Sequence, residues 1–182
     1  MNKLTNNREA TAAVSAGAKE LDIVINHPLL HSSHPEFNIA YPSIYSSLSS
    51  VRNACASLGV LLKVILETSQ LSAEEIVAGS VLAVAAGADF IKTSTGFLGR
   101  GASIDDVHIM ASIASHPSIL DLRAEEWKSR QVKVKASGGV RSNADLMKMV
   151  EAGASRIGTS AGVVIMTEGQ DAGLTDKGAD GY

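Results

Sequence analysis

Short apolar runs alternate with longer helical segments along this chain. Short runs of β-branched or apolar residues indicate strands at 20–26, 60–67, 87–96, 132–139 and 156–160. Helical patterns lie between or before them at 8–18, 43–58, 72–87, 103–115 and 142–153. Strands that alternate with helices predict an α/β fold with a parallel sheet and right-handed crossovers.

Two of the apolar strands contain a lysine where burial is expected. Lys92 and Lys135 each stand in such a run shortly before glycine ends it. A buried ammonium group is costly unless it is paired. A lysine amine attacks a carbonyl only when it is unprotonated, and its ordinary pKa of about 10.4 falls when the amine is buried or lies near another cation. The pair therefore favours Schiff-base chemistry. The alternative is that one or both ammonium groups reach solvent at the strand ends.

Two further strands carry charged residues at alternating positions. Asp22 is predicted to share a strand face with Val24, and Lys63 is predicted to point the same way as Ile65. Asp22 is a candidate for proton transfer, and Lys63 is a third candidate for an inward lysine. Three histidines lie close together in the sequence, at positions 27, 31 and 34. Prolines interrupt their spacing and no acidic or thiolate ligand stands nearby, so we predict no metal site.

Composition narrows the class of protein. The chain has 182 residues, 45% of them hydrophobic and 19% charged, with a net charge of −3 and a pI near 5.9, as expected for one soluble domain. No basic cluster indicates a nucleic-acid partner. Its single cysteine, Cys55, excludes an internal disulfide and favours a reducing compartment. Neither a leader segment nor a membrane span is visible in the pattern. We expect a cytoplasmic protein without a membrane partner.

The repeating strand-helix unit predicts a TIM (β/α) barrel, because the polar candidates then gather at the carboxyl ends of its strands. A closed barrel has eight strands, whereas only about five of eight βα units are predicted here. The chain is therefore expected to form a single, incomplete barrel domain over residues 1–182, with 171–182 as a flexible tail. An open five-stranded sheet is the alternative.

Four motifs resemble those of the deoxyribose-phosphate aldolase family, which are class I aldolases built on a TIM barrel. They are 20–26 (Glu-Leu-Asp-Ile-Val-Ile-Asn), 62–68 (Leu-Lys-Val-Ile-Leu-Glu-Thr), 87–96 and 133–141. The resemblance covers nearly the whole chain. It implies reversible cleavage of 2-deoxyribose 5-phosphate to glyceraldehyde 3-phosphate and acetaldehyde in deoxyribonucleotide catabolism, without a metal or other cofactor.

The resemblance also implies roles for single residues. Lys92 corresponds to the Schiff-base nucleophile, Lys135 to the cation that favours its free amine, and Asp22 to the proton-relay carboxylate. Lys63 resembles a supporting position, with a structural ion pair as the equal alternative. The family also ends in a mobile tyrosine, which implies a gating or proton-transfer role for Tyr182; a free terminus is the alternative. The family's phosphate cradle corresponds to Gly96, Gly138, Gly139, Gly158 and Ser160.

The departure from the family lies at the front of the chain, where about three βα units are not represented. We expect interior residues such as Val24, Ile65 and Phe90 to be exposed, and the chain to self-associate, so a homo-oligomer is possible. Three functions stay open: an active aldolase, a truncated non-catalytic fragment that binds a partner, and another phosphate-binding barrel enzyme such as an isomerase.

Overall fold

A curved sheet of five parallel strands organises the molecule. The computed structural model describes the backbone of residues 3–31, 37–56 and 59–175 and the side chains of 8–31, 41–55 and 59–169. The strands are β1 (Glu20–Val24), β2 (Leu61–Ile65), β3 (Phe90–Lys92), β4 (Lys133–Ser137) and β5 (Arg156–Gly158), and they lie in the order β1-β2-β3-β4-β5. Every neighbouring pair is parallel, which confirms the predicted α/β architecture.

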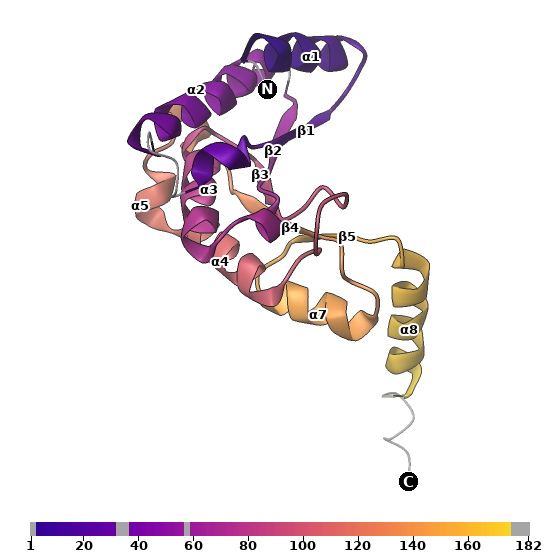
Figure 1. Ribbon diagram of the computed structural model, residues 1–182. Helices are drawn as coiled ribbons and strands as arrows, with labels where there is room; N and C mark the ends of the chain where they lie inside the picture. The colour runs from indigo at the N-terminus through magenta and orange to yellow at the C-terminus, as the bar shows by residue number, and fades with distance from the viewer. Residues whose placement is uncertain (1–2, 32–36, 57–58, 176–182) are drawn as a thin grey trace.

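Helices connect successive strands and line one side of the sheet (Figure 1). The long ones are α1 (Lys3–Ser15), α2 (Phe37–Ala56), α3 (Ala73–Ala85), α4 (Ile104–Ser115), α7 (Asn143–Glu151) and α8 (Gly162–Thr175). Short helical turns are η1 (His27–Leu30), η2 (Thr68–Gln70), α5 (Pro117–Leu120) and α6 (Glu125–Lys128). Side chains of Ser72, Ser103 and Ser142 accept the hydrogen bonds that cap α3, α4 and α7 at their first turns. Within the described residues, no helix is long and apolar enough to cross a bilayer.

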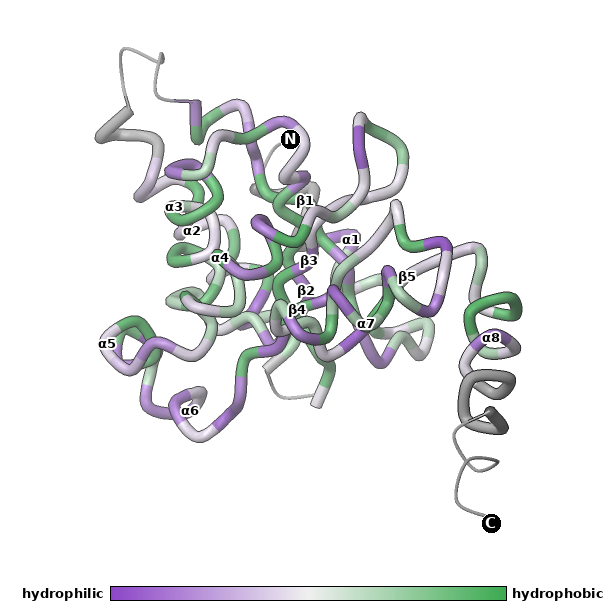
Figure 2. The backbone as a smooth tube through the Cα atoms, turned by 90° about the horizontal axis from the view of Figure 1, so that it is seen from below, coloured by the Kyte–Doolittle hydropathy of each residue, from purple (hydrophilic) through white to green (hydrophobic). Residues whose placement is uncertain are grey.

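The two faces of the sheet differ sharply in chemistry. Successive side chains of a strand point to opposite faces, so one alternating set packs under the helices. That set is buried and apolar, and it includes Leu21, Leu62, Val64, Ile91, Val134 and Ala136. The other set, on what we call the inner face, is mostly charged: Glu20, Asp22, Lys63, Lys92, Lys135 and Arg156. In Figure 2 both green and purple stretches appear among the central strands, as expected when apolar and charged residues alternate along them.

The expectation that Ile65 and Phe90 would be exposed is wrong. Ile65 is 5% exposed and Phe90 6%, whereas Val24 on the edge strand is 38% exposed as expected. The Phe90 ring lies under two cations, with the Arg156 guanidinium 4.2 Å and the Lys63 ammonium 5.8 Å from its centroid. Long charged side chains therefore cover the apolar part of the inner face, using cation–π contacts that the alternation pattern does not reveal.

The segment 116–130, between the α4 helix and the β4 strand, contains helical turns and a buried aromatic residue. It contains α5 and α6 and buries Trp127, whose ring stacks 3.8 Å from the Arg52 guanidinium. Arg52 and Arg130 both donate to the Asp89 carboxylate, at 2.9 Å and 2.7 Å. This cluster ties the connection to the amino-terminal end of β3, away from the carboxyl ends of the strands.

Three other helices differ from the prediction, and one of them is α1, which begins five residues earlier than predicted. Helix α2 begins at Phe37 and passes through Pro42, where the missing N–H removes one helical hydrogen bond. Tyr41 packs against the core, which stabilises this first part of the helix. Helix α8 was not predicted, and its backbone continues to Thr175 through the start of the expected tail. The rest of that tail, including Tyr182, lies outside the described residues.

Candidate active site

Lys92 and Asp22 meet on the inner face although 70 residues separate them. Lys92 is the last residue of β3, and Asp22 is the central residue of β1, with β2 between the two strands. Their charged groups are joined by a hydrogen bond of 3.2 Å from Lys92 Nζ to Asp22 Oδ2. The Lys92 side chain is only 12% exposed, whereas that of Asp22 is 36% exposed. A largely enclosed amine thus lies beside a carboxylate that solvent can reach.

Lys63 lies between two carboxylates on the same face. Its ammonium group donates to Asp22 Oδ1 at 2.8 Å and also contacts the Glu20 carboxylate. The Lys63 side chain is 2% exposed, so these two anions stabilise a charge that burial would otherwise disfavour. The inward direction predicted for Lys63 is the direction that it takes here.

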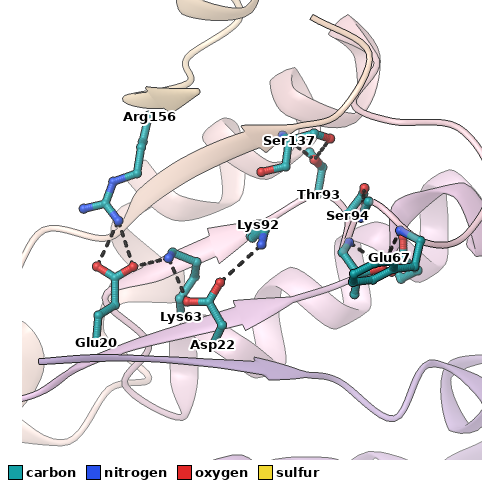
Figure 3. A network of polar contacts seen from close by, with 12 residues as sticks. Glu20, Asp22, Lys63, Glu67, Lys92, Thr93, Ser94, Ser137 and Arg156 are labelled. Atoms are coloured by element: carbon teal, nitrogen blue, oxygen red, sulfur yellow. Dashed lines mark hydrogen bonds and ion pairs between the residues drawn. The ribbon is translucent and has the colours of Figure 1, made fainter. Parts of the chain in front are cut away.

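Glu20 and Arg156 are part of the site although sequence reasoning did not select them. Arg156 Nη1 donates to both carboxylate oxygens of Glu20, at 2.8 Å and 2.9 Å, and so links the edge strands β5 and β1 (Figure 3). Glu20 could have been found from its position two residues before Asp22, which places both side chains on one strand face. Arg156 could have been found as a cation at the first position of the predicted strand at 156–160.

Lys135 stands directly beside Lys92 in the sheet register. Burial and the charges of Lys63 and Lys92 lower the pKa of Lys135, while Asp22 opposes them. The structure therefore brings together the two lysines that the sequence singled out. Lys63 and Arg156 lie on the same face, on β2 and β5.

Asp22 is held in its ionised form. Burial raises the pKa of Asp22, but hydrogen bonds and charges from Lys63 and Lys92 outweigh this effect, and the net pKa lies below the ordinary value of 3.8. A carboxylate at neutral pH accepts protons, either directly or through water. Asp22 can therefore receive a proton from a group that reacts at Lys92.

Glycines predicted to cradle phosphate gather around one loop. Gly96, Gly138 and Gly139 all have positive φ, at 92°, 78° and 79°. The Gly96 amide donates to Ser94 Oγ and the Gly138 amide to the carbonyl of Gly158, so these two N–H groups are engaged within the chain. Gly139 follows directly and leads into α7. The first amides of α7 already donate to the carboxylates of Asp145 and Glu168, so the glycine turn, and not the helix terminus, is the part suited to an anion.

Gly158 also has a steric reason to be glycine. A Cβ atom there would come within 2.6 Å of Ser137 Oγ and 3.1 Å of Lys135 Cε. The chain therefore approaches Lys135 closely from β5. Ser160 follows on the same connection and is exposed.

Glu67 is another residue that the prediction passed over. It directly follows the β2 run, is fully buried, and has a left-handed φ of 59°, which is uncommon for a residue other than glycine. Its carboxylate accepts hydrogen bonds from the amide and hydroxyl of Thr95, at 3.0 Å and 2.5 Å. Glu67 therefore fixes the loop that leaves the Lys92 strand. Strained backbone of this kind is concentrated at functional sites.

Comparison with known proteins identifies the family of this chain. The family model described as DeoC/LacD family aldolase matches residues 2–169. A deoxyribose-phosphate aldolase of Coccidioides immitis is 46% identical over 160 residues, and one of Thermotoga petrophila is 41% identical over 167 residues. These matches cover 88% and 92% of this chain.

Solved structures give the same result. The fold superposes on a Coccidioides immitis protein assigned as a deoxyribose-phosphate aldolase with a TM-score of 0.75 and 43% identity, over 93% of this chain and 59% of the other. The tetrameric deoxyribose phosphate aldolase of Aeropyrum pernix gives a TM-score of 0.72 at 30% identity, over 94% of this chain and 64% of the other. The chain spans 53% of the length of the Coccidioides relative and 58% of the Thermotoga relative, so it matches only part of each.

Proposed function

Because the chain belongs to the DeoC/LacD aldolase family, we propose that it is a deoxyribose-phosphate aldolase that works through a Schiff base on Lys92. The observation that carries this proposal is the position of the Lys92 amine, 3.2 Å from the Asp22 carboxylate and next to Lys135 in the sheet. The family relationship supports the class of reaction. The substrate is taken from the names of the relatives.

The reaction begins at the aldehyde carbon, C1, of 2-deoxyribose 5-phosphate. The unprotonated Lys92 amine adds to C1 to give a carbinolamine, which loses water and becomes a protonated imine. The C2–C3 bond then breaks, its electron pair flows toward the imine nitrogen, and the C3 hydroxyl gives up its proton. This releases glyceraldehyde 3-phosphate and leaves an enamine on Lys92. Protonation of the enamine at C2 and hydrolysis of the imine release acetaldehyde and restore the amine.

Asp22 is suited to move the protons in this sequence. It lies beside the Lys92 amine, is partly open to solvent, and is ionised at neutral pH. It can take a proton during carbinolamine formation and dehydration, directly or through a bound water, and return one later. Lys135 and Lys63 place positive charge on either side of the strand that carries this amine.

The phosphate group is assigned to the glycine turn that leads into α7. The turn at Gly139 is suited to an anion, and Gly96 reaches the same region through Ser94. Gly158 and Ser160 complete the assignment from the β5 side. Tyr182 remains a prediction as a gating or proton-transfer residue.

The proposal includes deoxyribonucleotide catabolism, which consumes this sugar phosphate. It also includes the cytoplasm, since the described thiol Cys55 is free and buried, as is typical of a reducing compartment. A homo-oligomer is part of the proposal because the Aeropyrum pernix relative is tetrameric.

Borohydride trapping tests the reaction directly. Acetaldehyde and borohydride should attach one ethyl group to Lys92 of the wild-type chain, and peptide mass spectrometry should locate it there. Lys92→Arg should abolish this label and leave the fold intact, because arginine keeps the charge but is not a nucleophile. Labelling of that variant at the wild-type rate would disprove the assignment.

The same experiment separates the aldolase from the other functions. A non-catalytic binding fragment or an isomerase should give no acetaldehyde adduct. Turnover of deoxyribose 5-phosphate, followed by the appearance of glyceraldehyde 3-phosphate, then tests the substrate itself.

A further inference from the structure

Charged side chains of alternating sign form a continuous chain across the inner face. It runs from Arg156 through Glu20, Lys63 and Asp22 to Lys92, and each member contacts the next (Figure 3). The mechanism above uses the last three members. Arg156 and Glu20 remain unexplained by it, although they are connected to the same network.

Glu20 lies between two cations in this series of charged side chains. One Arg156 nitrogen lies 2.8 Å and 2.9 Å from the two Glu20 oxygens, and the Lys63 ammonium contacts the same carboxylate. Burial raises the pKa of Glu20, but hydrogen bonds from Arg156 and Lys63 outweigh it, so Glu20 is ionised at neutral pH. Lys63 is therefore shared between Glu20 and Asp22, and Glu20 is shared between Lys63 and Arg156.

This sharing limits how strongly Lys63 can act on Asp22. With Glu20 uncharged, the buried Lys63 ammonium would have Asp22 as its remaining carboxylate partner in the chain. Asp22 would then be drawn toward Lys63 and away from the Lys92 amine, which it reaches at 3.2 Å. Arg156, in turn, orients Glu20 by bonding both of its oxygens, and its guanidinium is stacked on the Phe90 ring.

We propose that the Glu20–Arg156 ion pair is a positioning element of the active site, which places Lys63 and Asp22 and balances the charge around the two reactive lysines. This inference rests on the proposed function, because it assumes that Lys92 forms the imine. Neither residue touches the reacting atoms, so both are positioning residues that act through others.

Charged groups on four strands share the inner face with this pair. They are Asp22 on β1, Lys63 on β2, Lys92 on β3 and Lys135 on β4. The pKa of Lys135 is lowered by burial, Lys63 and Lys92, and Arg156 contributes in the same direction. Removing the Glu20 charge makes this region one unit more positive, which favours free amines. Removing the Arg156 charge has the opposite effect.

A purely structural role of the Glu20–Arg156 ion pair would give a different result. If the pair only joined the edge strands β1 and β5, both single variants would destabilise the fold, and the pH dependence of imine formation would stay that of the wild type. Opposite shifts from the two partners of one ion pair would therefore identify a role in the site.

The test measures borohydride trapping of acetaldehyde against pH for the wild type, Glu20→Gln, Arg156→Gln and the double variant. Acetaldehyde carries no phosphate, so the assay reports the lysine site alone. We expect the midpoint pH of labelling to fall by about 0.5 unit in Glu20→Gln and to rise by about 0.5 unit in Arg156→Gln, less than for a neighbour in direct contact. The double variant should return close to the wild-type midpoint. Glu125→Gln, which breaks an exposed ion pair on α6, is the control and should not shift it.

Unchanged midpoints in both folded single variants would overturn the inference. If either glutamine variant fails to fold, Glu20→Asp provides the second test, because it keeps the charge and shortens the reach to Lys63. We expect that variant to lower kcat for deoxyribose 5-phosphate several-fold with KM and the midpoint unchanged, and wild-type kcat would count against the inference. A wild-type chain that traps no acetaldehyde would overturn the proposed function, and this inference with it.

Discussion

Asp89 is predicted to be a principal stabilising residue of this fold. Its carboxylate accepts hydrogen bonds from Arg52 at 2.9 Å, from Arg130 at 2.7 Å and from the Leu62 amide at 2.9 Å. Arg52 and Asp89 have side chains that are only 2% and 7% exposed. Arg123 is also buried nearby and donates to the carbonyl of Ala88. One carboxylate therefore compensates a group of guanidinium charges.

The perturbation is Asp89→Asn, which removes the charge and keeps the shape. Breaking a buried ion pair by neutralising one partner costs about 3–5 kcal/mol, since the other charge stays buried. The Arg130 side chain is 34% exposed, so loss of its contact adds little. Because asparagine retains one acceptor for the Leu62 amide, we expect the free energy of unfolding to fall by about 3 kcal/mol. That is a large part of the roughly 5–15 kcal/mol typical of a domain.

Urea unfolding followed by circular dichroism measures this change. With an m-value of about 2 kcal/mol per molar urea, the midpoint should fall by roughly 1.5 M. Glu125→Gln, in an exposed pair with Lys128, is the matched control and should unfold like the wild type. The pH midpoint of acetaldehyde trapping should not move in Asp89→Asn, because Asp89 stands at the other end of β3 from Lys92. A loss below about 1 kcal/mol would show that the guanidinium groups do not depend on this carboxylate.

Three further predictions concern the site and its surroundings. Lys135→Leu removes a cation beside the nucleophile and should raise the pH midpoint of acetaldehyde trapping by about one unit; an unmoved midpoint in a folded variant would exclude this role. Gly101→Ala should weaken turnover of the phosphorylated substrate more than acetaldehyde trapping, because its Cβ would lie 2.2 Å from the carbonyl carbon of Gly138, in the proposed phosphate turn. Gly162→Ala is the control, because a Cβ there meets nothing within 4 Å. Burial raises the pKa of Asp106, but the hydrogen bonds and charge of Arg100 act against it, and the net pKa lies below the ordinary value of 3.8. The stability that Asp106 contributes is therefore present above about pH 4 and is lost as the pH falls further. Asp106→Asn should unfold more readily than the wild type at pH 7, and its stability should fall less on acidification. Urea titrations at neutral and at acidic pH measure both effects.

The alternation of apolar and polar residues determined much of the architecture. A strand has a side-chain period of two, so the pattern fixed which residues of each strand face the helices and which face inward. Lys92 and Lys135 were both predicted to point inward by this rule, and the alternation of strands with helices predicted that their strands are parallel. Glycine before a strand and serine before a helix marked most element ends. These are local properties, and a sequence carries them directly.

Contacts between distant elements were decided by the tertiary structure. Glu20 and Arg156 are 136 residues apart and lie on opposite edges of the sheet, and only its curvature brings them together. Phe90 is buried because two long cations lie over it, and an alternation pattern reports a face without reporting what covers it.

The strained Glu67 also illustrates this limit. Nothing local requires a left-handed backbone at a glutamate. Its conformation is maintained by hydrogen bonds to Thr95, on a loop 28 residues away. The sequence therefore determined the five strands, their order and the inward lysines. The charge network that joins the strands depends on how far the sheet curves and on which long side chains can reach one another.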